Sequence, residues 1–288
     1  GDNNSAFGFF ALGNNTSGGN NTMVGAYAGA LNIDDADNTV IGYAANYPDG
    51  GSNVTAVGSV ALNANTGSDN TAVGKSAMEA NTTGTANVAV GNLALDTNTS
   101  ASYNTAIGYG TLTANTTGHD NTAVGINSLA GNTTAHYNTA VGSSALEGCT
   151  TGEYNTAVGQ LSMDAASMTG NFNSALGRAA LGANTTGSSN CAVGINALGS
   201  NTTGNTNCAM GDGALDANTT AANNIGVGYN AGGAITTGAQ NTVVGTTSGN
   251  AITTGASNTL VGYQAGLKIT TTGGNTQIGS EAGEEITT

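Results

Sequence analysis

Residues Asn121-Thr122-Ala123-Val124-Gly125 are one copy of a phrase that returns along the whole of this 288-residue chain. Thirteen of the sixteen intervals between its closing glycines are 17 residues long, two are 16 and one is 18. The closing glycines are Gly8, Gly25, Gly42, Gly58, Gly74, Gly91, Gly108, Gly125, Gly142, Gly159, Gly177, Gly194, Gly211, Gly228, Gly245, Gly262 and Gly279. A fixed period across a chain is the signature of a solenoid, in which each repeat forms one coil stacked on its neighbours.

The residue just before each closing glycine is large and apolar in all seventeen repeats, as in Val124 and Val141. Its β-branched majority favours a strand, and we expect this column to face the core of the coil. We therefore predict an all-β fold: a parallel β-solenoid, or β-roll, of about 17 coils with a 17-residue period. We expect it to form an intertwined or side-by-side homotrimer.

One residue earlier, a column of mostly alanine is non-polar in sixteen of seventeen repeats. Successive side chains of a strand point to opposite faces, so this column is expected on the outside of the coil. A long exposed apolar strip marks an interface, and we interpret it as the seam between identical chains. The alternative is a flattened coil that covers the column itself. The predicted seam residues are Ala72, Ala89, Ala106, Ala123, Ala140, Ala157, Ala175 and Ala192.

The second half of the repeat exists in two forms. Up to residue 227 the fourth residue after the closing glycine is usually Leu or Met; from Gly228 onward glycine takes this place and Ile appears three residues later. We therefore divide the chain into coils 1–227 and coils 228–288, in which the apolar anchor has moved. This half is either a bent second strand or one helical turn. The phrase's Asn, present in sixteen of seventeen repeats, predicts a ladder of side-chain amides.

The composition of the chain limits the classes of partner that it could bind. Seventeen acidic and three basic residues give a net charge of −14, which disfavours nucleic acid because phosphate binding needs clustered Lys and Arg. No apolar stretch is long enough to predict membrane insertion. Neither end looks like a polar cap, so we expect a piece of a longer protein. Cys191 and Cys208 replace the phrase's Thr in consecutive coils, where we expect them to be packed as Thr would be rather than bridged.

The phrase Asn-Ser/Thr-Ala-Val-Gly, with a small residue three positions on, resembles the head repeats of trimeric autotransporter adhesins. That resemblance implies a left-handed parallel β-roll in a trimer, although the 17-residue spacing is longer than in those repeats. The longer form 121–134 is similar to repeats of phage tail-fibre and related surface proteins. The resemblance covers nearly the whole chain and implies an extracellular, virion-surface or cell-surface location.

Two columns carry candidate sites. Exposed rings that could hold a sugar face, or only stabilise the stack, are expected five residues before the glycine, at Tyr103, Tyr137, Tyr154 and Phe172. One position earlier, His119, His136 and Glu153 could bind a divalent metal, or form an ordinary exposed turn. The acidic cluster Asp34, Asp35 and Asp37 could bind Ca²⁺, although a solvated turn suits its spacing better. No other cofactor is expected.

No nucleophile with a base, phosphate loop or recurrent carboxylate pair is visible, so we do not expect an enzyme. The leading hypothesis is a structural and adhesive fibre shaft, of a phage tail fibre or a cell-surface adhesin, whose repetitive surface contacts host glycans or receptors. Two alternatives remain. One is a self-assembling extracellular filament, and the other is an ice-binding solenoid using threonine pairs such as Thr82-Thr83, Thr116-Thr117 and Thr133-Thr134.

Overall fold

A computed structural model describes residues 1–47 and 50–283. Within these residues there is no helix, and seventeen strands of three residues each alternate with turns and bends. The chain divides into two compact units, Gly1–Ser143 (unit 1) and Ser144–Thr288 (unit 2), which we describe separately.

The strands coincide with the repeated phrase. Unit 1 contains β1 (Ser5–Phe7), β2 (Thr22–Val24), β3 (Thr39–Ile41), β4 (Thr55–Val57), β5 (Thr71–Val73), β6 (Val88–Val90), β7 (Thr105–Ile107), β8 (Thr122–Val124) and β9 (Thr139–Val141). Unit 2 contains β10 (Thr156–Val158), β11 (Ser174–Leu176), β12 (Cys191–Val193), β13 (Cys208–Met210), β14 (Ile225–Val227), β15 (Thr242–Val244), β16 (Thr259–Val261) and β17 (Thr276–Ile278).

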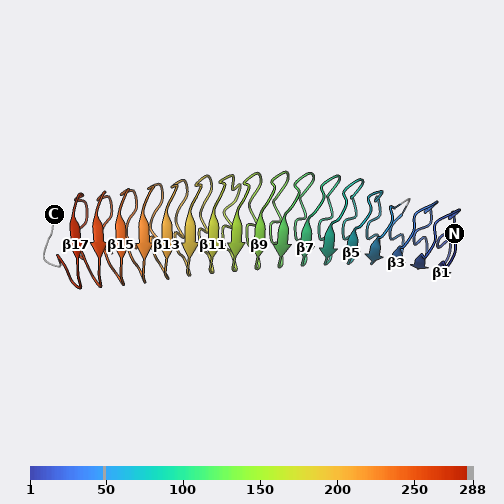
Figure 1. Cartoon of the computed structure of the whole chain (residues 1–288), viewed down its shortest axis with the longest axis horizontal. Coiled ribbons are helices and arrows are strands. Elements are labelled where there is room, and N and C mark those ends of the chain that lie inside the picture. The colour runs from blue at the N-terminus through green and yellow to red at the C-terminus, as the bar shows by residue number, and fades with distance from the viewer. Residues whose placement is uncertain (48–49, 284–288) are drawn as a thin grey trace. The chain divides into compact units, whose positions relative to one another are not determined.

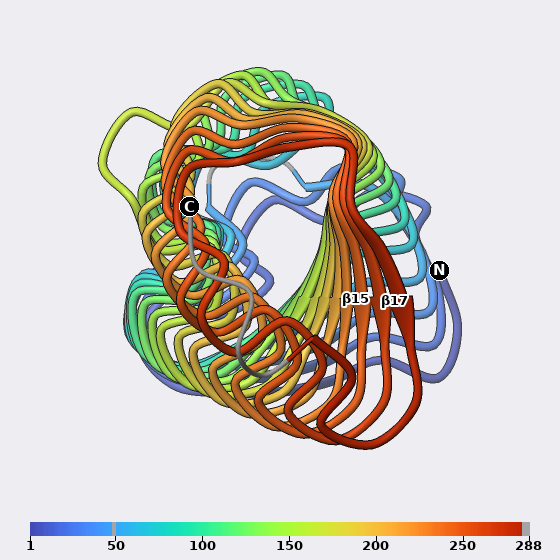
Figure 2. The same ribbon diagram turned by 90° about the vertical axis from the view of Figure 1, so that its left-hand side faces the viewer.

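Consecutive strands of each unit pair in parallel and in register, as Figure 1 shows. In β8 and β9, for example, Ala123 lies opposite Ala140. Viewed along the stack, the coils of a unit overlie one another as a single loop (Figure 2). The predicted all-β, parallel β-solenoid with a 17-residue period is therefore confirmed, whereas the homotrimer stays a prediction.

The inner and outer faces of the strands are the opposite of those predicted from the sequence. The alanine column lies inside the coil: all eight residues predicted to form the outer seam, Ala72, Ala89, Ala106, Ala123, Ala140, Ala157, Ala175 and Ala192, are at most 2 % exposed. The column before the glycine, expected in the core, points outward; Ile41 and Leu176 are 41 % and 52 % exposed. Both orientation predictions were wrong, and the covered-coil alternative describes the alanines correctly.

The reason is the narrow cross-section of the coil, in which a small side chain must face a large one. Leu and Met from the fourth position after the glycine are fully buried and fill most of the interior, as Leu129 and Leu146 do. In β15 and β16, where the inner strand residue is large, the facing position is glycine: a Cβ on Gly249 would lie 2.7 Å from Cγ1 of Val243. Small and large residues thus exchange places across the packed interior of the coil.

The half of the coil after the closing glycine is neither a second strand nor a helical turn. It is a run of turns in which every second residue has a left-handed backbone, such as Asn127 and Leu129, both at φ 53°. The N–H groups of these left-handed residues donate to carbonyls of neighbouring coils; the Leu112 N–H, for example, donates to the Ser128 carbonyl at 3.1 Å. Backbone groups are therefore satisfied between coils instead of within a helix.

The predicted amide ladder is confirmed, and a second one accompanies it. In the first, the Asn121 backbone N–H and its Nδ2 both donate to Oδ1 of Asn104, at 3.0 and 3.2 Å. In the second, seven residues after the glycine, Nδ2 of Asn98 donates to Oδ1 of Asn81 at 2.6 Å. These amides are fully buried, and burial is tolerated because the neighbouring coil supplies their partners.

The closing glycines have a backbone that other residues avoid. Gly125 has φ +133°, outside the left-handed region that Asn and Asp tolerate. A Cβ there would also lie 2.4 Å from the carbonyl oxygen of Gly142. Backbone conformation therefore favours glycine at every repeat, and contact with the next coil also requires it up to Gly262.

Unit 2 absorbs the single 18-residue interval in a loop. The extra residue between Gly159 and Gly177 is taken up around Ala166 and Ser167, which are exposed. The yellow-green loop that projects from the stack in Figure 2 corresponds to this segment. Met168 turns back into the core and is fully buried.

Candidate functional site

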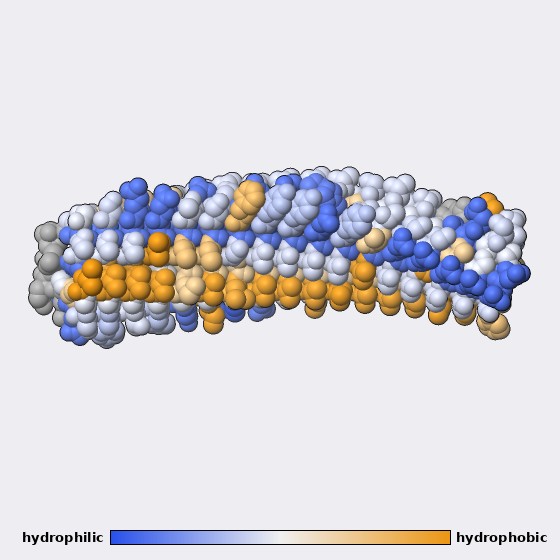
Figure 3. Space-filling view, in the orientation of Figure 1, coloured by the Kyte–Doolittle hydropathy of each residue, from blue (hydrophilic) through white to orange (hydrophobic). Residues whose placement is uncertain are grey.

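The most extensive surface feature is an apolar band on the outer side of the strands, which Figure 3 shows in orange. We call it the outer apolar stripe. In unit 1 it consists of Phe7, Val24, Ile41, Val57, Val73, Val90, Ile107, Val124 and Val141. In unit 2 it consists of Val158, Leu176, Val193, Met210, Val227, Val244, Val261 and Ile278.

Every member of the stripe is exposed or half-buried. Since parallel strands are stacked about 4.8 Å apart, the nine strands of unit 1 alone extend it over roughly 40 Å. Monomeric soluble proteins rarely expose a contiguous apolar strip of this extent. In unit 2 it includes a shallow hollow of about 170 Å³ around Val158, Leu176 and Val193.

The four rings predicted to bind a ligand all reach the surface. Tyr103 and Phe172 are 63 % and 60 % exposed, and Tyr137 and Tyr154 are exposed as well. In unit 2 the rings of Tyr154 and Phe172 are stacked, with centroids 5.2 Å apart. In unit 1 the ring of Tyr137 meets His119 edge-on at 5.3 Å.

The backbone under these rings is unusual. All four residues are left-handed, with φ between 57° and 64°. The same column elsewhere contains Asn20, Asp69 and Asn223, whose short polar side chains suit this conformation, whereas an aromatic side chain does not. Strain of this kind is informative when it recurs on a surface, because the ring must be retained for a reason other than the turn.

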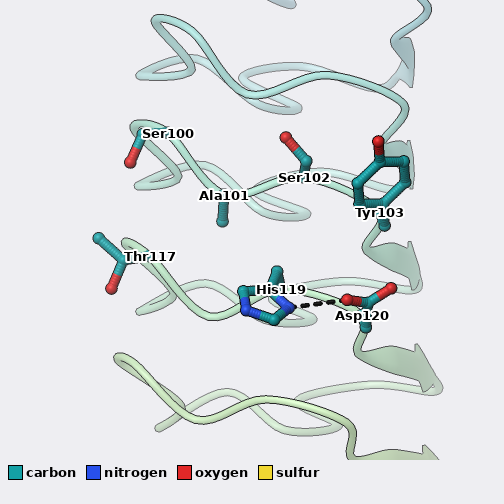
Figure 4. Close-up of a pocket in the computed structure, with 7 residues that line it drawn as sticks. All are labelled: Ser100, Ala101, Ser102, Tyr103, Thr117, His119 and Asp120. Carbon is teal, nitrogen blue, oxygen red and sulfur yellow. Dashed lines mark hydrogen bonds and ion pairs between the residues drawn. The ribbon is translucent and has the colours of Figure 1, made fainter.

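Tyr103 lines a hollow beside these rings, a depression of about 290 Å³ drawn in Figure 4. Ser100, Ser102 and Thr117 contribute hydroxyl groups to it. Nδ1 of His119 lies 2.7 Å from Oδ2 of Asp120, and this pair forms the opposite edge. An exposed ring beside several hydroxyls, an imidazole and a carboxylate offers one apolar face and many hydrogen-bonding groups.

The metal site expected at His119, His136 and Glu153 is not assembled. The two imidazoles of unit 1 stack with centroids 3.8 Å apart, and Nδ1 of His136 accepts the backbone N–H of His119 at 3.0 Å. In the part of the chain that the structure describes, no three His, Cys, Asp or Glu side chains gather as a metal-binding group. In another coil the same backbone N–H is bound by a hydroxyl, since the Thr85 N–H donates to Oγ of Ser102. At His119 the imidazole of His136 takes the place of that hydroxyl.

The acidic turn that contains Asp35 and Asp37 forms hydrogen bonds between coils. Oδ1 of Asp35 accepts a bond from Ser52 at 3.3 Å, and Oδ1 of Asp37 accepts one from Asn20 at 2.9 Å. Two carboxylates of the proposed Ca²⁺ cluster are therefore hydrogen-bonded to neighbouring coils.

The threonine pairs lie on bends, and their two hydroxyls differ. The first hydroxyl bonds to a carbonyl of the next coil, as in Thr82 to Thr99 at 2.6 Å and Thr116 to Thr133 at 3.0 Å. The second residue, such as Thr83 or Thr117, is exposed. The first row of hydroxyls, exposed at Thr82 and half-buried at Thr116, is thus bonded between coils, and the second row is the more exposed of the two.

Sequence reasoning missed an aromatic cluster in the first coils of unit 1. The rings of Phe9, Phe10, Tyr27, Tyr43 and Tyr47 lie within 5.4 to 6.4 Å of one another in successive pairs. Three of them, Tyr27, Tyr43 and Tyr47, line a hollow of about 350 Å³. Four of these rings lie in the two positions after a closing glycine, and Tyr47 lies five residues after one. The residues at these positions vary from coil to coil, so no constant column marks the cluster in the sequence.

Comparisons with known proteins add no identification. No protein-family model matches the chain, and no curated protein sequence is significantly similar to it. The search for membrane spans, confined to the described residues, finds no helix with the length and apolar character to cross a bilayer.

Proposed function

We propose that this chain is a structural and adhesive shaft of an extracellular fibre, of the phage tail-fibre or surface-adhesin kind, and that its copies associate side by side as a homotrimer. The observation that carries the proposal is the outer apolar stripe. Its position differs from that expected from sequence, but the argument for an interface is the same: within the described residues the stripe faces outward, and each of its members is exposed or half-buried.

Association along the strands suits the geometry of a solenoid. Each coil contributes one apolar residue at a fixed spacing, so identical chains aligned along their stacks bring stripe against stripe. The flanking column, mostly Thr, is uncharged and adds no desolvated ion to such an interface.

The adhesive part of the proposal is supported by the exposed rings. Tyr103, Tyr137, Tyr154 and Phe172 give each unit two rings on the same column, and the hollow at Tyr103 adds hydroxyls and a carboxylate. Rings and hydroxyls together complement the apolar and polar faces of a sugar. Several weak contacts per chain, multiplied by three chains, would act through avidity.

The solution mass tests the shaft directly. Light scattering should give three times the 27.7 kDa of the chain, and Val90→Glu with Val124→Glu should reduce this to a single chain. Thr83→Glu with Thr117→Glu places the same charges on the exposed threonine row and should leave the trimer intact. A wild-type mass of one chain would refute the trimer.

The rings are tested by Tyr103→Asn, which removes the aromatic face while supplying a residue that favours the left-handed backbone. The variant should fold at least as well as the wild type and lose retention on an array of immobilised oligosaccharides. Thr254→Asn, an exposed threonine of unit 2 that is not among the residues lining the hollow, is the matched control. Equal retention of all three proteins would remove the glycan contact from the proposal.

A further inference from the structure

Two cysteines of unit 2 occupy equivalent positions in consecutive coils. Cys191 begins β12 and Cys208 begins β13, and the two are register partners in the parallel sheet. Both are half-exposed thiols. The third cysteine, Cys149, is fully buried.

In-register neighbours of a parallel sheet have their Cα atoms about 4.8 Å apart, within the range of about 4.4–6.8 Å that disulfides span. Their side chains leave the sheet on the same face, so the two sulfur atoms point the same way. The two thiols are also close enough to interact: burial, and then the neighbouring Cys191, raise the pKa of the Cys208 thiol.

The same geometry limits the strength of a bond. Parallel Cβ atoms stand about as far apart as the Cα atoms, whereas a relaxed disulfide holds its Cβ atoms about 3.8 Å apart. Closing the bond must draw β12 and β13 together locally. A disulfide strained in this way, and open to solvent, is readily reduced.

We propose that Cys191 and Cys208 are a redox-labile pair that forms a reversible disulfide between consecutive coils. With glutathione disulfide as oxidant, one cysteine thiolate attacks a glutathione sulfur and releases one glutathione thiolate. The second cysteine thiolate then attacks the mixed disulfide and releases the other. The two cysteines are oxidised, glutathione disulfide is reduced to two thiols, and the two cysteine protons end on them.

Such a bond would join β12 to β13 on the outer face, two residues before Val193 and Met210 of the outer apolar stripe. The pair would thus make one step of the stack responsive to the surrounding redox potential. This inference depends only on the register of two coils, and it holds whether or not the chain is a fibre shaft.

The chain is well suited to a test by peptide mass. Trypsin cleaves only after Lys75, Arg178 and Lys268, so Cys149 falls in peptide 76–178 and the pair falls together in peptide 179–268. The folded protein is incubated with glutathione disulfide at pH 8, its free thiols are alkylated in denaturant, and it is digested. We expect peptide 179–268 to lose the mass of two hydrogen atoms and to carry no alkyl group, with dithiothreitol restoring both thiols.

Cys149 is the internal control, because burial raises the pKa of its thiol to about 12 and it should be alkylated only after unfolding. Cys191→Thr restores the residue common in that column and leaves Cys208 alone, so the loss of two hydrogens should vanish. Persistence of two alkylated cysteines in peptide 179–268, a glutathione adduct on each of them, or a disulfide joining two chains would each overturn the proposal. None of these results would bear on the mass of the native particle, which tests the shaft.

Discussion

Two stretches of unit 2 use one backbone and two different interiors. The coils of β11 to β13 are filled by an inner alanine, a leucine and a buried asparagine, as in Ala192, Leu198 and Asn201. The coils of β15 and β16 are filled by a larger strand residue, a glycine and an isoleucine, as in Leu260, Gly266 and Ile269. The backbone hydrogen bonds between coils are the same kind in both. The volume of the interior is thus conserved while its chemistry is not.

The junction between the two kinds shows what is lost. Nδ2 of Asn218 donates to Oδ1 of Asn201 at 3.2 Å, which continues the second amide ladder. In the next coil the equivalent position is Ile235, and among the residues described Oδ1 of Asn218 has no hydrogen-bond partner. The ladder therefore ends at a buried, unsatisfied oxygen, whereas the first amide ladder runs on through Asn224 and Asn241.

We expect the largest loss of stability from substitution of the closing glycines, which both kinds of coil have in common. Gly194→Ala and Gly245→Ala each place a Cβ within 2.4 Å of the next coil's carbonyl oxygen, at φ near +131°. Each should lower the free energy of unfolding by about 3 kcal/mol or more, in either interior. Denaturant titration measures this. Gly182→Ala, whose Cβ would meet its nearest atom at 3.2 Å, is the control, and an equal loss there would contradict the argument.

The second prediction exchanges one interior for the other. Gly249→Leu alone would overpack against Val243 and Ile252, and should cost about 3 kcal/mol. Adding Val243→Ala and Ile252→Asn converts the coil to the leucine kind and should recover at least half of this loss. Thermal unfolding of the single, double and triple variants gives the coupling free energy. Strictly additive losses would show that the interiors are not interchangeable.

The third prediction concerns the amide ladder. Asn201→Ala removes the donor to Oδ1 of Asn184 (2.9 Å) and the acceptor for Asn218, so about 2 kcal/mol of stability should be lost. Asn218→Ala should cost only about half as much, because the Asn218 oxygen already lacks a partner. The two variants differ by one coil and provide controls for each other in the same denaturant titration. The reverse order would contradict the ladder.

The smallest effect is electrostatic and confined to the leucine coils. Burial, and then the nearby carboxylate of Asp212, raise the pKa of Asp216 above its usual value. A carboxyl whose pKa is raised by folding contributes most to stability below its unfolded pKa, and this contribution is lost as the pH rises through the folded value. Asp216→Asn should therefore stabilise the protein at pH 7 by no more than about 1 kcal/mol, since solvent screens a half-exposed group. Identical stability of the variant and the wild type from pH 3 to 7 would contradict this reasoning.

The period, the strands and the first amide ladder were predictable because they repeat, and a repeat averages out local ambiguity. Which face of the strand points into the core was not predictable, because Ala123 and Val124 are both apolar and hydrophobicity alone ranks the valine as the core residue. The decisive signal was reciprocity of size: glycine replaces leucine in the coils where Val243 and Leu260 replace alanine. That pattern shows which column faces the leucine.

Some features of the candidate sites were likewise predictable from the sequence, and others were not. The exposure of Tyr103 and Phe172 followed from their column, whereas the metal site failed because a column position does not determine where an imidazole nitrogen points. The Nδ1 atom of His136 is occupied by the backbone of His119. The cluster around Tyr27 was missed because it lies in columns without a constant residue.

The loop at Ala166 and Ser167 has a consequence for how such a chain changes over time. An additional residue was accepted there, in a bend, while the strands and closing glycines on both sides kept their register. Because each coil bonds to its immediate neighbours, removal or duplication of one whole coil between equivalent positions leaves every remaining interface of the same type. Length is then a heritable quantity that varies in steps of one coil, independently of composition, and small insertions at the bends can introduce new surface without altering that count.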